Sequence, residues 1–445
     1  DMHAVDARWG NGDDGGSVNQ PGHGTKMAGL ALYGDLTTHL GGLGKVVLRH
    51  GLESVKVLPP RPAGANDPEH YAAIAAAGAS LPEIVAPKRL RVFHLAVTSP
   101  DGRRSGRATS WSAAIDALSA GRQFDATSKE LRYIDGDQAM RRLFVVSAGN
   151  VQRENLAPNH IDVSDTDPIH DPSQAWNALT VGAFTDRDVI DDPVLYPGFR
   201  PMAPRGEASP WNTTSVTFGK GWPIKPDVLA EGGNIGTNGT DVDHTIPSLV
   251  GLTTHHQPNR RMLDLALGTS AACAEVARVC AGVMVEYPHL WPETIRALVV
   301  NSARWTPPME ARFQQAKSKA ECEALVRRYG FGVVDERRAL KSARDALTLI
   351  SHAALIPSDK NKAHEIHYLQ LPWPKVALEA IGAADVVLRV TLSYFVEPCA
   401  GERGWAKRYA YPSHGLRFAM KRPLESEGKL KRRLNKLAND DGAAA

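Results

Sequence analysis

The most informative stretch of the sequence is Leu267-Gly-Thr-Ser-Ala-Ala-Cys-Ala-Glu-Val-Ala277. A glycine-led turn presents the hydroxyl of Ser270, and small apolar residues without an interior proline continue to Val285. This composition predicts a buried helix over residues 271–285 with Ser270 in its first turn. A serine placed there lies in the positive field of the helix start, which suits a nucleophile whose product is an oxyanion. The alternative is that Ser270 only caps the helix, because such caps are common.

The length and composition limit the classes of protein to consider. A chain of 445 residues is too long for one ordinary core, so we expect one large domain and a smaller one. The content of 42% hydrophobic and 23% charged residues is typical of a soluble globular protein. A net charge of +3 favours neither a nucleic-acid nor a membrane partner. No uninterrupted apolar run reaches about 18 residues, so we expect no segment that spans a bilayer.

The cysteines do not form the pattern of a disulfide framework. Cys273 and Cys280 lie on the same predicted helix, where a separation of roughly 10 Å prevents them from bridging. The remaining two are Cys322 and Cys399. The pattern favours a reducing, cytoplasmic location.

A histidine stands at a second helix start. Gly22-His23-Gly24-Thr25 precedes an apolar helix that we expect to end near Gly34. The flanking glycines allow another backbone to approach closely. His23 is therefore a candidate general base, although a single histidine is more often structural.

Strand patterns alternate with helical ones over residues 22–303. The strand pattern that begins at residue 142 ends in the small residues 147–149 and then Asn150, at the position where the carboxyl end of a strand in an α/β sheet carries ligand-binding groups. The alternative is a turn asparagine. The alternation predicts βαβ units and a mostly parallel sheet. Strands are expected at residues 46–49, 53–58, 91–97, 142–147, 178–183 and 225–230, and helices at 68–77, 108–120 and 337–349.

Four motifs in this order resemble the subtilisin-like serine proteases. They are Gly22-His-Gly-Thr25, Val145-Val-Ser-Ala-Gly-Asn150, Lys225-Pro-Asp227 and Gly268-Thr-Ser-Ala-Ala272. The resemblance covers nearly all of residues 1–350 and implies an α/β fold with a mostly parallel sheet flanked by helices.

The resemblance also implies roles for individual residues. Ser270 corresponds to the nucleophile of a serine endopeptidase, His23 to its general base and Asn150 to its oxyanion donor. The substrate would be a protein or peptide. By the same resemblance, the pocket for the residue before the scissile bond would lie between Ala96, Val97 and Thr98 on one side and Ser147, Ala148 and Gly149 on the other.

The catalytic aspartate of the family is not evident in this sequence. Asp1, Asp6, Asp13 and Asp14 precede His23, but none follows an expected strand or precedes the Ser/Thr-Gly pair of the family. We therefore expect the aspartate upstream of residue 1, with Asp6 as the best candidate within the chain. The chain begins without an initiator methionine, and both of its ends look cut.

A second departure follows the nucleophile. Ala274-Glu275 stand where the family usually has Pro-His, which indicates a divergent branch. An alternative is a catalytically inactive relative that binds extended peptides, or a fragment that is inactive without the aspartate. The sequence also resembles a bacterial branch that is often encoded beside AAA-type ATPases, which would make such an ATPase a partner.

No cofactor is expected. A structural calcium ion is conceivable near His170, but the spacing of the aspartates there lacks the glycine of an EF-hand, and a solvated loop is favoured. These aspartates are Asp162, Asp165, Asp167 and Asp171.

The domain boundaries follow from a change of period. We expect a catalytic domain at residues 1–350, a linker at 351–362 and a C-terminal β-sandwich-like domain at 363–445. Alternating apolar and polar residues over 386–395 indicate a half-exposed strand, and 364–371, 376–381 and 414–421 are similar. Residues 424–437 are expected to form a solvated helix.

Overall fold

A computed structural model describes most of the chain. The described residues are 1–9, 22–40, 42, 45–60, 64–100, 106–125, 130–133, 140–219, 221–345, 348–353, 358–359, 362–363, 374–395, 419–422 and 424–442. They group into two compact units, one formed by residues 1–354 and 368–411 and the other by 355–367 and 412–445.

A parallel sheet forms the centre of the first unit. Its strands run in the order β10 (Val228–Glu231), β7 (Leu179–Thr185), β6 (Leu143–Ser147) and β3 (Val92–Leu95). All three pairings along this path are parallel, and the two-residue β9 (Glu207–Ala208) pairs antiparallel with β7. Every residue of β6 and β7 is buried, as expected for strands covered on both faces. The predicted strands in these four regions are confirmed.

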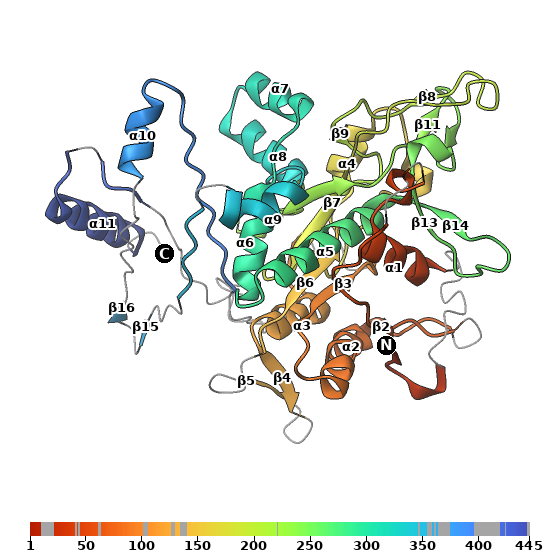
Figure 1. The fold of residues 1–445 in the computed structure, drawn as a ribbon, viewed down its shortest axis with the longest axis horizontal. Coiled ribbons are helices and arrows are strands. Elements are labelled where there is room, and N and C mark those ends of the chain that lie inside the picture. The colour runs from red at the N-terminus through yellow and green to blue at the C-terminus, as the bar shows by residue number, and fades with distance from the viewer. Residues whose placement is uncertain are drawn as a thin grey trace. The chain divides into compact units, whose positions relative to one another are not determined.

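Helices cover both faces of this sheet (Figure 1). On one face, α5 (Gly268–Glu286) packs against all four of these strands and against α6 (Pro292–Ser302) and α9 (Glu336–Asp345). On the other face, α2 (Tyr71–Val85) and α3 (Ser110–Ser119) contact the alternate residues of β6. The α/β class and the parallel sheet are therefore confirmed.

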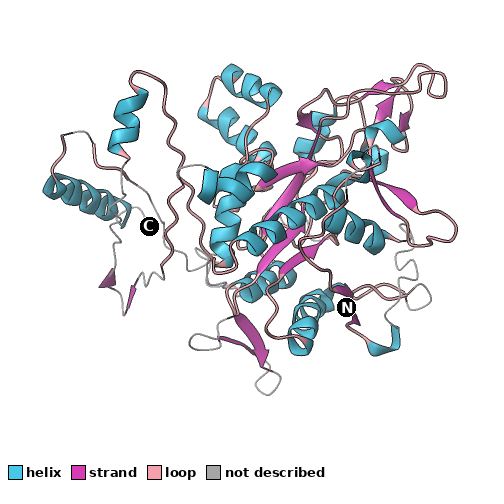
Figure 2. Cartoon of the chain, viewed as in Figure 1, coloured by secondary structure: helices cyan, strands magenta, loops and turns pink. Residues whose placement is uncertain are grey.

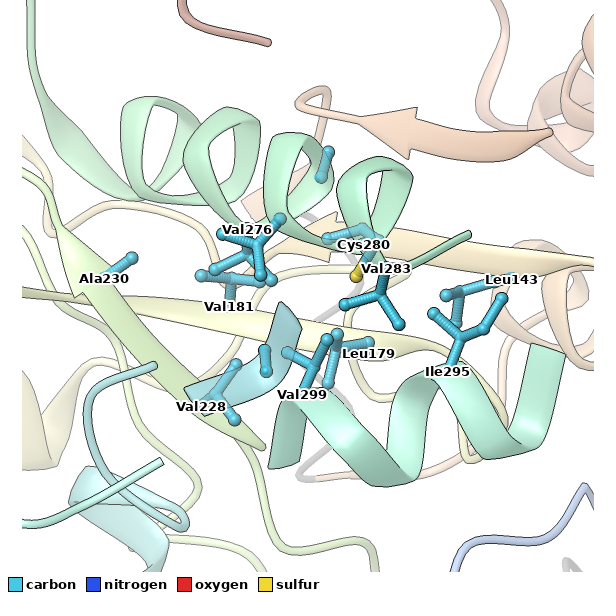
Figure 3. Close-up of a cluster of buried hydrophobic side chains, with 14 of the residues drawn as sticks. Leu143, Leu179, Val181, Val228, Ala230, Val276, Cys280, Val283, Ile295 and Val299 are labelled. Atoms are coloured by element: carbon cyan, nitrogen blue, oxygen red, sulfur yellow. The ribbon is translucent and has the colours of Figure 1, made fainter. Parts of the chain in front are cut away.

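The main core lies between α5, α6 and the sheet. Figure 3 shows Val276, Cys280 and Val283 of α5 facing Val181 and Leu179 of β7. Ile295 and Val299 of α6 fill the next layer beside Leu143 and Val228. Small residues on α5 allow this close approach, so the apolar run seen in the sequence is explained by packing.

The helix α5 is long and apolar enough to cross a membrane by length and composition. However, 78% of the window that meets this test is buried inside the protein, as in the core helix of a globular domain. Cys273 and Cys280 on this helix are free thiols, as is Cys322, while Cys399 lies outside the described residues.

The first unit contains further helices and short strands outside this sheet (Figure 2). The further helices are α1 (His23–Tyr33), α4 (His160–Thr166), α7 (Pro307–Gln315), α8 (Lys319–Tyr329) and α10 (Lys375–Ile381). The further strands are β1 (Met2–Ala4), β2 (Ser54–Lys56), β4 (Arg122–Asp125), β5 (Glu130–Tyr133), β8 (Arg200–Pro201), β11 (Gly236–Thr237), β12 (Val242–Asp243), β13 (Gly251–Thr254) and β14 (Leu263–Ala266). Short 3₁₀ turns are η1 (Ala7–Trp9), η2 (Leu36–Thr38), η4 (Pro68–His70), η6 (Arg153–Asn155) and η7 (Pro247–Leu249).

Three of the predicted strands are wrong, those at residues 46–49, 376–381 and 386–395. Residues 46–49 form no strand, and Val47 is 77% exposed, because no neighbouring strand pairs with this segment in the described structure. Residues 376–381 belong to the helix α10. In all three cases the apolar pattern has no neighbouring strand among the described residues that would complete a sheet.

The C-terminal prediction of a β-sandwich stays a prediction, as do the domain boundaries and the linker. Residues 386–395 are extended but belong to no strand, and 364–371 lie outside the described residues. The described part of the second unit contains a two-residue hairpin, β15 (Ser358–Asp359) with β16 (Lys362–Ala363), and the helix α11 (Glu427–Gly442). The expected helix in the region 424–437 is confirmed.

Candidate active site

Ser270 is the third residue of α5. The N-cap of this helix is Leu267, so the hydroxyl of Ser270 does not act as the cap. Ser270 Oγ instead lies 3.4 Å from the carbonyl oxygen of Ala96, to which it donates. Gly268 has a φ of +81°, and a Cβ there would lie 2.7 Å from Asn150 Oδ1. The helix start therefore requires glycine, which explains the Gly-Thr-Ser order.

His23 is the first residue of α1. Its Nε2 lies 3.3 Å from the same carbonyl oxygen of Ala96. The N-cap is Gly22, where φ is +73° and a Cβ would lie 2.3 Å from Nδ1 of His256. The two glycine-led helix starts thus bring His23 and Ser270 to one backbone atom at the end of β3.

The packing of α1 against α5 holds this arrangement. Met27 and Leu30 of α1 form a buried cluster with Ala271 and Ala274 of α5. On its other side, α1 is tied to the strand β13, because Thr253 Oγ1 donates to the carbonyl oxygen of Lys26 at 2.7 Å. The histidine and the serine are therefore carried by two helices that are packed together.

Asn150 follows β6 and contacts the start of α5. Its Oδ1 accepts hydrogen bonds from Thr269 N at 2.8 Å and from Thr269 Oγ1 at 3.0 Å. These two bonds fix the orientation of the side-chain amide, in which Nδ2 is the donor atom. The sequence analysis did not identify Thr269 as a site residue, although its position next to Ser270 could have indicated a role there.

The two predicted walls of the substrate pocket lie at the same edge of the sheet. Residues 96–98 follow β3. Ser147 is the last residue of β6, and Ala148 and Gly149 follow it. The strands β3 and β6 are parallel neighbours. Ser147 and Ala148 are buried, with 1% and 0% exposure. The chain at Gly149 has a φ of +99° and lies against the ring of His170. Asp171, next to that histidine, forms a β-bridge with Ser99, which joins the two walls.

A second histidine lies beside the first. His94 precedes Ala96 by two residues on β3, so both point to the same face of the sheet. Burial, and then the positive charge of His23, lower the pKa of His94 to about 4. His94 is therefore neutral near pH 7. Sequence reasoning missed it, although alternation along β3 from Ala96 places it on the same face.

The expectation that no aspartate before His23 follows a strand is wrong, because Asp6 follows β1. This three-residue strand pairs in parallel with β2, which lies within the predicted strand 53–58, but no local pattern indicated the pairing. The carboxylate of Asp6 accepts hydrogen bonds from Arg8 Nε at 2.9 and 3.1 Å. Those bonds lower the pKa of Asp6 to about 2. Asp13 and Asp14 lie outside the described residues, and the position of the catalytic aspartate stays a prediction.

Two of the acidic residues considered for calcium, Asp165 and Asp171, bind protein partners through their carboxylates. Asp165 forms a bidentate pair with Arg328, whose Nε lies 2.8 Å from Oδ1. Asp171 Oδ1 accepts from Thr109 Oγ1 at 2.7 Å and from Gln174 Nε2 at 2.9 Å. Across the part of the chain that the structure describes, no group of three or more His, Cys, Asp or Glu residues could hold a metal ion.

The Lys-Pro-Asp motif anchors the sheet. Lys225 is 2% exposed, and its Nζ donates to the Ala178 carbonyl oxygen at 2.9 Å and to Asp227 Oδ2 at 2.7 Å. The same carboxylate accepts from Thr180 N, which joins the start of β10 to β7. The motif therefore contributes to packing and lies outside the chemical site.

Comparison with known proteins identifies the family of this chain. Residues 1–332 match the model of the subtilase family, peptidase S8. The uncharacterized protein y4bN of Sinorhizobium fredii (strain NBRC 101917 / NGR234) is 26% identical over 309 residues, and the match covers 65% of this chain and 63% of y4bN.

Two solved structures also match part of this chain. A lanthipeptide protease has a TM-score of 0.41 at 16% identity, with 73% of this chain and 76% of that chain covered. The epidermin leader peptide processing serine protease EpiP from Staphylococcus aureus has a TM-score of 0.39 at 16% identity, with 73% and 64% covered. Because the family model covers residues 1–332 of the 445, the chain belongs to the subtilase family of serine peptidases.

Proposed function

We propose that this chain is a serine endopeptidase that hydrolyses peptide bonds through an acyl-enzyme on Ser270. The observation that carries the proposal is that Ser270 Oγ and His23 Nε2 lie 3.4 and 3.3 Å from one carbonyl oxygen, that of Ala96. A nucleophile and a base held by two packed helices need little rearrangement to act on one substrate carbonyl.

In the first half of the reaction, His23 takes the proton of the Ser270 hydroxyl as its oxygen attacks the carbonyl carbon. The tetrahedral intermediate collapses when the imidazolium returns this proton to the leaving amine, and an ester on Ser270 remains. In the second half, His23 takes a proton from water, and the resulting attack releases the carboxylate product and restores the hydroxyl.

Asn150 is proposed to stabilise the oxyanion of both tetrahedral intermediates. Thr269 holds the amide in one orientation by donating to its oxygen, and Nδ2 is the donor group of this amide. The N-terminal field of α5 adds to this stabilisation, because Ser270 lies in the first turn of a 19-residue helix. In subtilisin, another member of the family, removal of one such donor costs about 10²–10³ in kcat.

The proposed substrate is an extended peptide whose residue before the scissile bond lies between residues 96–98 and 147–149. A second candidate function, peptide binding without hydrolysis, is favoured by the place of β3 at the end of the central sheet as described. An extended peptide can add to such an edge through backbone hydrogen bonds. The two candidates differ in whether Ser270 becomes acylated.

Labelling with a fluorophosphonate tests the proposal. We expect the protein to be labelled, and we expect both Ser270→Ala and His23→Ala to abolish the label. Ser318→Ala is the matched control, because Ser318 also stands at a helix start, where its Oγ accepts from Glu321 N. Persistence of the label in Ser270→Ala would contradict the proposal, and an unlabelled but peptide-binding protein would favour the second candidate.

A further inference from the structure

One short segment joins the two walls of the proposed substrate pocket. Ser99, which follows the first wall, exchanges two backbone hydrogen bonds with Asp171, at 2.9 and 3.1 Å. The backbone N–H of His170 donates to the carbonyl oxygen of Ala148 in the second wall at 3.0 Å. The segment formed by His170 and Asp171 is therefore bonded to both walls, and it forms the floor of the space between them.

The opposite end of this space lies at the proposed catalytic residues. The carbonyl oxygen of Ala96, at the start of the first wall, is 3.4 Å from Ser270 Oγ. The second wall is followed by Asn150, whose side chain contacts Thr269 beside the serine. The chain from Ala96 to Ser99 advances by three residues and can span at most about 10 Å, which limits the depth from the catalytic residues to the floor.

The side chain of His170 takes up much of this depth. Gly149 has a φ of +99°, and a Cβ placed on it would lie 2.3 Å from Cγ and 2.5 Å from Nδ1 of His170. The imidazole ring is therefore in direct contact with the backbone of Gly149, which immediately precedes Asn150. Because the ring extends from the floor to the residue beside the proposed oxyanion donor, little depth remains for the side chain of a substrate.

The surroundings hold the ring in this position. His170 is 6% exposed, and a close-packed interior leaves such a ring no room to turn aside. The neighbouring residue is also fixed, because Asp171 Oδ1 accepts from Thr109 Oγ1 at 2.7 Å and from Gln174 Nε2 at 2.9 Å. We therefore expect the floor to stay in place when a peptide binds.

We propose that His170 limits the residue before the scissile bond to a small side chain, such as that of glycine, alanine or serine. A larger side chain would have to displace the buried ring or its neighbours, and such overpacking is unfavourable. The effect is steric and requires no hydrogen bond from the ring. The proposal rests on the proposed hydrolysis and names the class of substrate that this site accepts.

The test compares two succinyl-tripeptide p-nitroanilides that differ only in the last residue, alanine or phenylalanine. In the unaltered protein we expect kcat/KM to be about tenfold or more higher for the alanine substrate. In His170→Ala we expect kcat/KM for the phenylalanine substrate to rise by about tenfold or more, with a much smaller change for the alanine substrate. His160→Ala is the matched control, because His160 is also 6% exposed but lies on α4, outside both walls. It should keep the ratio of the unaltered protein.

Diphenyl phosphonates with the same two side chains extend the comparison, because they label the nucleophile without turnover. The same order of rates is expected, so slow hydrolysis does not prevent a result. Circular dichroism checks the fold of His170→Ala, and His170→Ser replaces it if that variant does not fold.

Two kinds of failure are distinguishable. Equal or faster reaction of the phenylalanine compounds with the unaltered protein, or an unchanged ratio in a folded variant of His170, would overturn the proposal while hydrolysis itself stands. Absence of hydrolysis together with absence of fluorophosphonate and phosphonate labelling would overturn the proposed hydrolysis and this proposal with it.

Discussion

The core around α5 and the segment 386–395 contain similar apolar residues and fold differently. Val276 and Val283 of α5 are 1% and 0% exposed, whereas Val387 and Leu392 are 89% and 53% exposed. The former pack between α6 and a four-stranded parallel path, while the latter have no paired strand in the described structure. An apolar pattern therefore indicates burial only where a second surface completes it.

Polar side chains hold the exposed segment. Arg296 of α6 donates to Ser393 Oγ at 2.9 Å and to the carbonyl oxygen of Tyr394 at 2.7 Å. Asn301 Nδ2 donates to Thr391 Oγ1 at 2.8 Å. One of these bonds satisfies a backbone carbonyl and the other two hold side-chain hydroxyls, so residues 391–394 are attached to α6 without the strand that was expected.

The largest effect is expected in the core. Ile295→Ala should lower the free energy of unfolding by about 2–5 kcal/mol, because the fully buried side chain leaves a cavity beside Leu143. Leu388→Ala in the exposed segment is the control and should change it by less than about 0.5 kcal/mol. Urea unfolding measures the free energy of both variants. Equal decreases in the two would contradict the expected difference between the core and the exposed segment.

A smaller effect depends on pH. The folded-state pKa of His94 is about 4 against an ordinary 6.5, so the unfolded state binds more protons between these values. The stability that His94 contributes is present above pH 6.5 and is lost as the pH falls towards 4, by up to about 3 kcal/mol.

His94→Leu should therefore weaken the dependence of stability on pH between 6.5 and 4. Thermal unfolding across this range measures the change. The exposed His289→Gln serves as the control and should follow the unaltered protein. An unchanged dependence in His94→Leu would show that burial around β3 is looser than in the rest of the core.

The smallest effect is expected at the contact between the two regions. Arg296→Ala removes the donors to Ser393 and Tyr394 and should open residues 391–395 locally by about 1–2 kcal/mol. Hydrogen exchange of these amides measures the opening, and the amides of β6 should keep their protection. Arg296→Lys retains the charge without the fork of donors and should give an intermediate result. Faster exchange throughout β6 would contradict this expectation, because it would show that the segment and the core open together.

Much of the fold could be predicted because local patterns and tertiary packing agree. The β-branched runs of β6 and β7 and the small-residue run of α5 each predict their element, since they match a doubly covered sheet. The structures of residues 46–49 and of α10 could not be predicted, because their apolar patterns resemble those of the strands that do form. Only the lack of a neighbouring strand to pair with distinguishes them. The three-residue β1 likewise forms through its pairing with β2.

The sequence alone placed His23 and Ser270 at glycine-led helix starts and Asn150 after a strand, because these positions depend on local backbone preferences. The tertiary structure decided that His23 and Ser270 meet at the carbonyl oxygen of Ala96, and that Thr269 occupies the oxygen of Asn150. These contacts join residues 73 to 174 positions apart, and they follow from how α1 and α5 pack on the sheet, which no local pattern encodes.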